Sequence, residues 1–391
     1  MRICLISGEF PPMQGGVGDF TWRLAEAMAA KGHQVMVLTS QQAAGAACQG
    51  CSVRAEVPRW NWGFWKTARR LFEESRPDVV NIQYQTAAYG MHPAVNLFPW
   101  WLRRRRERPA VVVTFHDLRM PFLFRGAGPL RRRVNDFLAQ QADGVIATNE
   151  EDFAQLTLRA PAVPRRLIPI GSNILPPASP DYSREAWRAR WGIQPHEFAL
   201  AYFGFLNVTK GGEDLIGALE LLVREGRPVK LIMVGGKVGS SDPTNLLYLN
   251  RVEQRIQQSR LEPYVVWTDY LPSEEVSATL WAADAVVLPY RDGVSTRRGT
   301  LMAALTHGRP IVTTIPSLPV HYFQDGENLL LVPPASPAEI ARAVQRLMED
   351  AGLRERLGKG ALALSERFTW PAIAEETLQF YIELLSRRRG T

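Results

Sequence analysis

The chain has 391 residues, of which 46% are hydrophobic and 22% charged. This length suits two domains of about 150–200 residues each, and the composition excludes a largely disordered chain. Lysine and arginine number 46 against 39 acidic residues, a formal net charge of +7. Such a balance favours an anionic partner, which could be nucleic acid, acidic lipid or a phosphorylated substrate.

The first residues, Arg2–Ser7, form a short apolar run that ends near Gly8 and the pair Pro11-Pro12. The run is too short for the core of a signal peptide and predicts a first strand. No stretch approaches the roughly 20 apolar residues that a membrane-spanning helix needs. We therefore expect a soluble protein, or one that is at most peripheral to a membrane.

Short apolar runs alternate with amphipathic stretches throughout the first half of the chain. Residues 19–31 have apolar positions every three or four residues and precede Gly32, which predicts a helix. The strands predicted in this half are residues 2–7, 34–39, 79–84, 110–115 and 144–147.

Cysteine is scarce, with only Cys4, Cys48 and Cys51 in the whole chain. Three cysteines do not make a disulfide framework, so we expect a reducing, cytoplasmic compartment. The Cys48-x-x-Cys51 spacing allows a redox pair or half of a zinc site, but no Cys or His cluster follows at metal-ligand spacing. We therefore expect two free thiols in a loop rich in alanine and glycine, and no metal.

The second half repeats the same alternation after the proline-rich segment 174–180, which predicts a domain boundary. Strands that are apolar throughout indicate parallel sheets covered by helices on both faces, and two such series predict two Rossmann-like domains. The predicted strands are residues 198–203, 229–234, 264–267, 285–288 and 310–313, and the predicted helices are residues 212–225, 273–282, 300–306 and 370–388.

A glycine-rich turn, Gly15-Gly16-Val17-Gly18, lies between the first strand and the first helix. Glycines here let a ligand approach the backbone, and the helix N-terminus favours an anion. A tight strand-to-helix turn needs the same residues for purely structural reasons. The order G-G-V-G-D-F departs from the dinucleotide pattern G-x-G-x-x-G, which disfavours a nicotinamide enzyme.

Basic residues precede two predicted helices of the second half, in Lys210-Gly211-Gly212 and in Arg297-Arg298-Gly299-Thr300. A cation beside a helix N-terminus can neutralise a phosphate. Either motif alone could be a solvated turn. The two together favour a site for both phosphates of a diphosphate.

His116 and Asp117 end the predicted strand 110–115, at the sheet edge where ligands of parallel sheets bind. A hydrogen-bonded structural histidine is the alternative interpretation.

These motifs, in this order, resemble the family 4 glycosyltransferases. The similar segments are ISGEFPPMQGGVGDFTWRLAEAMAAKGHQVMVLTS, VTFHD, AYFGFLNVTKGGEDLIGAL, VVWTDYLPSEEVSATLWAADAVVLPY, GRPIVTT and a final helix opened by Phe368-Thr369-Trp370. The resemblance covers nearly the whole chain. It implies the α/β fold called GT-B, in which two facing Rossmann-like domains enclose a cleft. The expected parts are an acceptor domain at 1–173, a nucleotide-sugar domain at 174–369 and a helix at 370–391 that packs back on the first domain.

The resemblance also implies roles for individual residues. His116, Lys210 and Arg298 would be catalytic, because stabilising the diphosphate leaving group is the main task in such a transfer. The nucleoside would lie near residues 235–236 and 269–270. The implied donor-binding residues are Gly15, Gly16, Asn207, Lys210, Gly236, Asp269, Tyr270, Asp292, Ser295, Arg297, Arg298, Gly299 and Thr300.

The sequence departs from the family where a pair of glutamates is expected. These positions fall at Ser295 and Ala303, and neither residue is acidic. Asp292 could replace the first carboxylate. The arginine of the family's turn before Lys210 is replaced by Phe205, and the neighbouring arginines 297–298 could restore the lost cation.

The resemblance implies a hexosyltransferase that moves a sugar from a nucleotide-diphosphate sugar to a glycan or lipid-linked acceptor, with retention and without a cofactor. Such an enzyme fits the synthesis of cell-envelope or exopolysaccharide glycans. A sugar-nucleotide epimerase of the same architecture is one alternative. A non-catalytic binding or scaffold protein is another, because the paired glutamates are missing.

Aromatic and basic residues cluster in the first half, which suits an anionic membrane surface at its inner face. Solvated helix faces with tryptophan in the core explain the cluster equally well, and an RNA groove less well. Nucleic acid is therefore the least expected partner. The cluster comprises Trp60, Trp62, Trp65, Phe98, Trp100, Trp101, Arg103–Arg106 and Arg131–Arg133.

Overall fold

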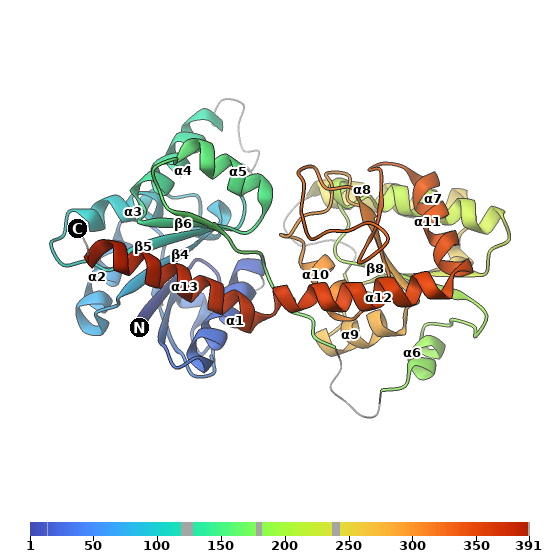
Figure 1. Ribbon diagram of the computed structural model, residues 1–391, viewed down its shortest axis with the longest axis horizontal. Helices are drawn as coiled ribbons and strands as arrows, with labels where there is room; N and C mark the ends of the chain where they lie inside the picture. The colour runs from blue at the N-terminus through green and yellow to red at the C-terminus, as the bar shows by residue number, and fades with distance from the viewer. Residues whose placement is uncertain (14, 119–127, 177–181, 237–242, 390–391) are drawn as a thin grey trace. The chain divides into compact units, whose positions relative to one another are not determined.

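The computed structural model describes residues 1–13, 15–118, 128–176, 182–236 and 243–389 (Figure 1). The chain divides into two compact units. Unit 1 comprises residues 1–171 and 369–391, and unit 2 comprises residues 172–368. Most of the predicted linker 174–180 lies outside the described residues.

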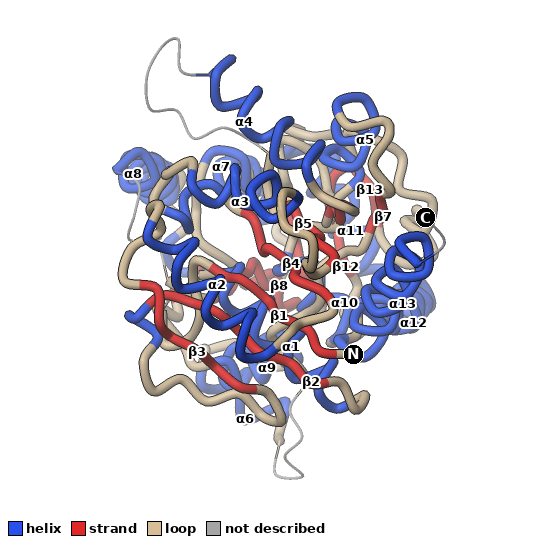
Figure 2. The backbone as a smooth tube through the Cα atoms, turned by 90° about the vertical axis from the view of Figure 1, so that its left-hand side faces the viewer, coloured by secondary structure: helices blue, strands red, loops and turns tan. Residues whose placement is uncertain are grey.

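Unit 1 is built on a seven-stranded parallel sheet with the strand order β3-β2-β1-β4-β5-β6-β7 (Figure 2). Side chains of α1 and α13 pack on one face of this sheet, and those of α2 to α5 pack on the other. The strands are β1 (Arg2–Ser7), β2 (Gln34–Ser40), β3 (Ser52–Val57), β4 (Val79–Tyr84), β5 (Ala110–Phe115), β6 (Gly144–Ala147) and β7 (Arg165–Leu167). The helices are α1 (Gly16–Ala30), α2 (Gly63–Ser75), α3 (Ala94–Arg103), α4 (Gly128–Gln141), α5 (Glu150–Arg159) and α13 (Trp370–Arg389).

Unit 2 contains a six-stranded parallel sheet with the order β10-β9-β8-β11-β12-β13. Its main core joins α7, α8, α11 and α12 to the sheet. The strands are β8 (Phe198–Phe203), β9 (Val229–Val234), β10 (Val265–Trp267), β11 (Ala285–Leu288), β12 (Ile311–Thr314) and β13 (Leu330–Val332). The helices are α6 (Arg184–Arg190), α7 (Gly212–Arg224), α8 (Pro243–Gln258), α9 (Ser273–Ala282), α10 (Gly299–Thr306), α11 (Pro337–Glu349) and α12 (Ala351–Ser365).

The predicted α/β architecture of two Rossmann-like domains is confirmed, and all ten predicted strands are present to within one residue at either end. Strands β3, β7 and β13, which are sheet edges, were not among the predicted strands. Because β3 and β7 are half-exposed along most of their length, they lack the continuous apolar run that marks the central strands.

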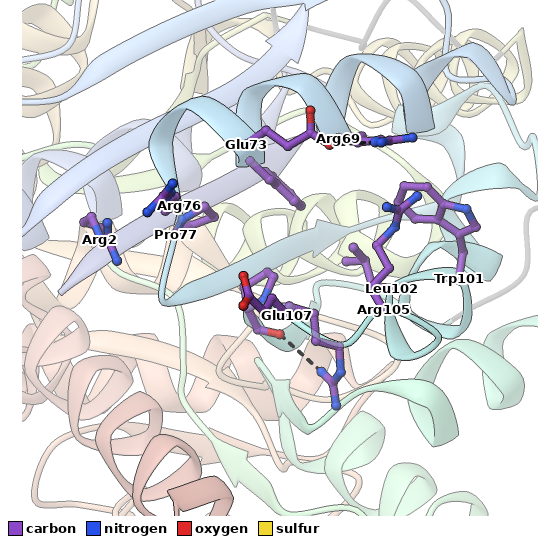
Figure 3. Close-up of a pocket in the computed structure, with 12 residues that line it drawn as sticks. Arg2, Arg69, Glu73, Arg76, Pro77, Trp101, Leu102, Arg105 and Glu107 are labelled. Carbon is purple, nitrogen blue, oxygen red and sulfur yellow. Dashed lines mark hydrogen bonds and ion pairs between the residues drawn. The ribbon is translucent and has the colours of Figure 1, made fainter.

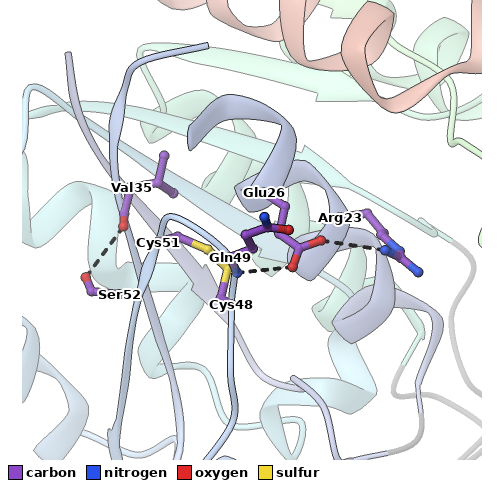
Figure 4. The surroundings of a disulfide bond; sticks show 7 residues. All are labelled: Arg23, Glu26, Val35, Cys48, Gln49, Cys51 and Ser52. Atoms are coloured by element: carbon purple, nitrogen blue, oxygen red, sulfur yellow. Dashed lines mark hydrogen bonds and ion pairs between the residues drawn. A yellow bond between two sulfur atoms is a disulfide. The ribbon is translucent and has the colours of Figure 1, made fainter. Parts of the chain in front are cut away.

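The prediction of two free thiols at Cys48 and Cys51 is wrong, because the structure joins them in a disulfide (Figure 4). Their Cα atoms lie 5.4 Å apart, within the range that a disulfide bridges. The loop is held against α1, where Glu26 accepts a hydrogen bond from the Gln49 backbone N–H at 3.1 Å. Cys4 is a buried free thiol in β1.

The last helix, α13, completes unit 1 although 197 residues of unit 2 precede it (Ser172–Phe368). The Tyr381 hydroxyl accepts a hydrogen bond from the Asn81 amide in β4 at 2.6 Å, and both side chains are fully buried. At Gly144 in β6, an added Cβ would lie 2.6 Å from the Leu384 side chain. This close approach fixes α13 on the sheet.

We expect Tyr381→Phe to lower the free energy of unfolding by about 1–3 kcal/mol, because it leaves the buried Asn81 N–H group without an acceptor. Phenylalanine keeps the ring volume, so packing is preserved. Urea unfolding measures the loss. An unchanged midpoint would show that this hydrogen bond does not stabilise the attachment of α13.

No helix among the described residues has the length and apolar character needed to cross a membrane.

Candidate functional site

The loop after β8 places Lys210 at the carboxyl edge of the sheet in unit 2. Asn207 caps the short 3-10 helix Val208–Lys210, since its side-chain oxygen accepts hydrogen bonds from the Lys210 N–H at 3.1 Å and from the Thr209 hydroxyl at 2.8 Å. Gly211 follows with φ +70°, and a Cβ there would lie 1.9 Å from the Pro289 carbonyl oxygen. Only glycine fits this position, so the turn fixes the backbone beside Lys210.

The Lys210 ammonium group is held in a buried position near Thr300, the second residue of α10. A Cβ on Gly204 would lie 3.2 Å from Lys210 Nζ and 2.9 Å from the Thr300 methyl carbon. Burial, together with repulsion from the Arg298 guanidinium, lowers the pKa of Lys210 to about 8 against the opposing attraction of Asp292. The structure thus brings the two predicted cations into one electrostatic cluster.

An ion pair that was not predicted joins the first turn of α7, which follows the Lys210 loop, to the loop after β11. The Arg291 guanidinium donates two hydrogen bonds to the Asp214 carboxylate, at 2.7 and 2.9 Å. The Arg291 backbone N–H donates to the Thr209 carbonyl at 2.8 Å. Such a two-pronged pair fixes orientation as well as distance. These contacts of Arg291 hold the loop that contains Lys210 next to the loop that contains the two arginines.

Asp292 is the shared partner of both predicted arginines. It pairs with Arg298 and lies 3.5 Å from an Arg297 guanidinium nitrogen. The Arg298 guanidinium also lies over the Tyr290 ring, 4.6 Å from its centroid. The Tyr290 hydroxyl is 2.6 Å from the Thr300 hydroxyl, which ties this loop to the start of α10.

The Ser295 hydroxyl oxygen and Arg298 Nε are buried polar atoms of this loop that have no hydrogen-bond partner among the described residues. Buried polar atoms are nearly always paired in native proteins. These two unpaired atoms therefore mark groups of this loop that are available to a ligand. Ala303, by contrast, is fully buried within α10 and brings no polar group to the site.

A second part of the edge lies after β9 and β10. The Gly235 N–H donates to the Thr268 hydroxyl at 3.0 Å, and Asp269 pairs with Gly235 through an isolated bridge. A Cβ on Gly236 would lie 3.0 Å from the Phe205 ring. Phe205 and Tyr270 are 51% and 78% exposed, so aromatic faces stand open beside the backbone of Gly235 and Gly236.

His116 follows β5 at the carboxyl edge of the sheet in unit 1. Its Nε2 lies 2.9 Å from the side-chain oxygen of Gln83, and its ring meets the Phe20 ring edge-on at 4.7 Å. Burial lowers the pKa of His116 to about 3. The imidazole is therefore neutral at physiological pH and can exchange hydrogen bonds with a polar ligand without carrying charge.

This pKa predicts how acid destabilises the protein. As the pH falls below about 6.5, His116 gains a proton in the unfolded chain but not in the folded one, so stability is lost toward the folded pKa. His116→Gln removes this loss. Between about pH 7.5 and pH 5, we expect the variant to lose about 1–2 kcal/mol less stability than the wild type. Chemical unfolding at both pH values measures the difference, and the exposed His196→Gln variant is the control. A pH dependence equal to that of the wild type would contradict the prediction.

The predicted glycine turn of unit 1 opens α1, which begins at Gly16. A Cβ on Gly15 would lie 1.8 Å from the Glu9 carboxylate, whereas a Cβ on Gly16 would meet nothing within 4 Å. A side chain at Gly15 would thus have to displace the Glu9 carboxylate, whereas Gly16 leaves open space.

Two carboxylates beside this turn were missed by the sequence analysis. Burial raises the pKa of both Glu9 and Asp19, and that of Glu9 is raised further by Asp19. Their position was readable in the sequence, since they flank the glycines between the first strand and the body of the first helix.

The aromatic and basic cluster of unit 1 is mostly packed into the protein. Trp60, Trp65 and Trp101 pack against the core, whereas Trp62 is 50% exposed. The Arg104 guanidinium covers Trp100 at 3.5 Å. The side chain of Arg131 lies outside the described residues.

Among the residues that the structure describes, the His, Cys, Asp and Glu side chains form no group of three or more that could hold a metal ion.

Two family models match consecutive parts of the chain. Residues 15–171 match the glycosyl transferase 4-like domain, and residues 183–363 match glycosyl transferases group 1. These two matches and the two parallel-sheet units define a glycosyltransferase of the GT-B class. The chain belongs to the family 4-like glycosyltransferases, as its motifs predicted.

Curated relatives are distant glycosyltransferases. The D-inositol 3-phosphate glycosyltransferase of Streptomyces bingchenggensis is 26% identical over 294 residues, covering 73% of this chain and 64% of that protein. The alpha-D-kanosaminyltransferase of Streptomyces kanamyceticus is 26% identical over 306 residues, covering 74% of this chain and 75% of that protein. The first match thus spans less than two thirds of the relative's length.

Solved structures share the fold across the whole chain. Sucrose-phosphate synthase from Thermosynechococcus elongatus has a TM-score of 0.76 at 23% identity, with 99% of both chains covered. HepE from Anabaena, solved in complex with UDP-glucose, has a TM-score of 0.74 at 20% identity, covering 99% of this chain and 100% of that one.

Proposed function

We propose that this glycosyltransferase moves a hexosyl group from a nucleotide-diphosphate sugar to a glycan or lipid-linked acceptor, with retention. The observation that carries the proposal is the cluster of Lys210 and Arg298 at the carboxyl edge of the sheet in unit 2. The related fold of HepE, which was solved with UDP and with UDP-glucose, supports a nucleotide-sugar donor.

In this proposal, the cation cluster stabilises the diphosphate as the bond to the sugar breaks. Negative charge then accumulates on the leaving phosphate oxygens, and fixed cations in a water-poor site stabilise that charge most strongly. Lys210 and Arg298 fill this role, with Arg297 beside them. The backbone N–H groups of Gly299 and Thr300 open α10 and can bind a phosphate oxygen.

Asp292 and Ser295 occupy the loop where the family carries its first glutamate. Asp292 orients both arginines, and the buried Ser295 hydroxyl has no partner among the described residues. We propose that Ser295 binds a hydroxyl of the donor. A hydroxyl in place of a carboxylate keeps a hydrogen bond but removes a negative charge from beside the diphosphate.

The nucleoside is proposed to bind at Gly236, Asp269 and Tyr270, with Asn207 shaping the neighbouring loop. Because glycine has no side chain, a planar base can approach the backbone of Gly236 closely. The exposed aromatic rings nearby offer faces on which the base can stack.

Unit 1 is proposed to contribute His116, Gly15 and Gly16. A neutral imidazole fits a hydrogen bond to a sugar hydroxyl, because it can both donate and accept. The open space at Gly16 leaves room for the sugar or its phosphate.

The missing paired glutamates favour one rival, a non-catalytic nucleotide-sugar-binding protein. Thermal unfolding with a panel of nucleoside diphosphates and their sugars tests binding. We expect at least one donor to raise the melting temperature, and stabilisation by none of them would overturn the proposal. Release of nucleoside diphosphate only in the presence of an acceptor distinguishes transfer from epimerisation, which changes the nucleotide sugar alone, and from passive binding.

We also propose a cytoplasmic location with peripheral contact to an anionic membrane through the exposed arginines of residues 103–106. Co-sedimentation with vesicles should increase with the fraction of anionic lipid. Binding that does not depend on anionic lipid would contradict this proposal.

A further inference from the structure

Unit 1 contains a pocket of about 480 Å³ on the sheet edge opposite to His116 and the glycine turn (Figure 3). Arg2 begins β1, Pro77 lies two residues before β4, and Pro109 directly precedes β5, so the pocket lies at the amino ends of these strands. His116 follows the carboxyl end of β5. The pocket is therefore separate from the proposed transfer site of unit 1.

The lining of the pocket is strongly basic. Figure 3 shows Arg2, Arg76 and Pro77 at one end, and Trp101 and Arg105 at the other. Two acidic residues, Glu73 and Glu107, also line it. The lining arginines are Arg2, Arg69, Arg76, Arg105 and Arg108.

Three of the arginines are already paired with carboxylates. Arg108 makes a partly buried two-pronged pair with Asp143, at 2.5 and 2.9 Å. Arg2 lies 3.2 Å from Asp78, and Arg69 lies 2.7 Å from Glu73. Among the described residues, no carboxylate lies within 4.0 Å of the guanidinium of Arg76 or Arg105. These two side chains supply the uncompensated positive charge of the pocket.

Arg105 is held in place by aromatic packing. Its guanidinium lies 4.2 Å from the centroid of the Trp101 ring, and that ring is stacked on Trp65 at 5.2 Å and on Phe98 at 5.5 Å. Arg105 Nε is buried and has no hydrogen-bond partner among the described residues. Buried charged donors are rarely left unpaired, so this guanidinium has bonding capacity for an anion.

Arg76 occupies a position that favours glycine. It ends α2 in the left-handed conformation, with φ 45° and ψ 62°, where a side chain is disfavoured. An arginine at this turn places a cation on the pocket wall at the expense of backbone strain. Strain of this kind is often kept where a side chain has a function.

We propose that this pocket binds a phosphate group carried on an apolar chain, as in the head group of an anionic lipid. Arg105 binds the phosphate through charge-assisted hydrogen bonds, and Arg76, at the opposite end, adds positive potential to the pocket. Phe72, Trp101 and Leu102 supply the apolar wall for the attached chain. A free phosphate ion would fill only a small part of the cavity. This proposal does not rest on the transfer reaction, because none of these residues belongs to the proposed donor site.

Calorimetric titration of the full chain with monomeric dihexanoyl phosphatidic acid tests the proposal. We expect saturable binding that Arg105→Gln weakens about 10-fold or more, as expected for loss of a charged hydrogen bond. Arg76→Gly should also weaken binding, but less, because it removes only the positive potential at the far end of the pocket. Arg76→Gly should keep or raise the melting temperature, because glycine relieves the left-handed turn. Weaker binding in this variant therefore cannot be attributed to unfolding.

Arg23→Gln is the matched control. The Arg23 guanidinium also lies over a tryptophan ring, 4.2 Å from the centroid of Trp22, but Arg23 does not line the pocket. Glycerol 3-phosphate separates the two sources of the phosphate. Affinity equal to that of the lipid identifies a soluble phosphate ester, and much weaker affinity identifies a lipid. Absence of saturable binding for both compounds would overturn the proposal, as would an equal loss of affinity in Arg23→Gln and Arg105→Gln.

Discussion

Lys210→Ala is expected to lower kcat by about 100-fold or more, because it removes a fixed cation from the position where leaving-group charge develops. The buried ammonium lies beside Thr300 and is coupled to Arg298. Turnover of the donor identified in the nucleotide-sugar panel measures the effect. Lys359→Ala is the matched control, because Lys359 is an exposed lysine on α12 that pairs with Glu355 within the same helix. If Lys210→Ala turns over the donor as fast as the wild type, Lys210 is not a catalytic residue.

The pH dependence of the same reaction gives a second measurement. Burial lowers the pKa of Lys210 to about 8, so the ammonium group loses its proton as the pH rises through that value. We therefore expect kcat/KM to fall above about pH 8 in the wild type. In Lys210→Arg the guanidinium stays charged, so this alkaline fall should shift to higher pH even if the activity is lower. If kcat/KM of Lys210→Arg falls at the same pH as that of the wild type, the titration of another group causes the fall.

Gly211→Ala is expected to lower the free energy of unfolding by about 2–4 kcal/mol, because it combines backbone strain with a backbone clash. The residue has φ +70°, and a Cβ would lie 1.9 Å from the Pro289 carbonyl oxygen. Relief of the clash must move the Lys210 loop away from the loop after β11. We therefore expect donor affinity to fall together with stability.

Gly226→Ala measures the cost of the left-handed backbone conformation without a steric clash, for comparison with Gly211→Ala. Gly226 has φ +69°, but a Cβ there would meet nothing within 4 Å. Its substitution should cost about 1 kcal/mol, the cost of the left-handed conformation alone, and donor affinity should stay unchanged. Urea unfolding and donor titration of both variants provide the comparison. Equal stability losses in the two variants would show that the contact with Pro289 does not constrain the loop.

The central strands could be predicted from the sequence because they are buried on both faces and therefore continuously apolar. Strand β5, for example, reads AVVVTF and is buried at every position. Edge strands do not carry that signal. Strand β7 is the half-exposed triplet Arg165–Leu167, and only its pairing with β6 identifies it.

The site was predictable where function depends on local chain chemistry. Glycine turns and basic helix N-termini appear as short motifs, and the structure groups Lys210 with Arg298. The pair between Arg291 and Asp214 was not predictable, because 77 residues separate its members along the chain. The bond between Cys48 and Cys51 was missed for a different reason, since the low cysteine content argued for reduced thiols.

The return of the last helix to unit 1 has a consequence for how the protein is made. A ribosome releases all residues of unit 2, Ser172–Phe368, before it releases α13. The apolar face of the first sheet that receives Ile373, Leu378 and Tyr381 thus stays uncovered while a complete second unit emerges. Unit 2 can finish folding during synthesis, whereas unit 1 begins first and finishes last. Any nascent chain stalled before residue 369 therefore displays an unfinished core, which is the kind of surface that chaperones bind.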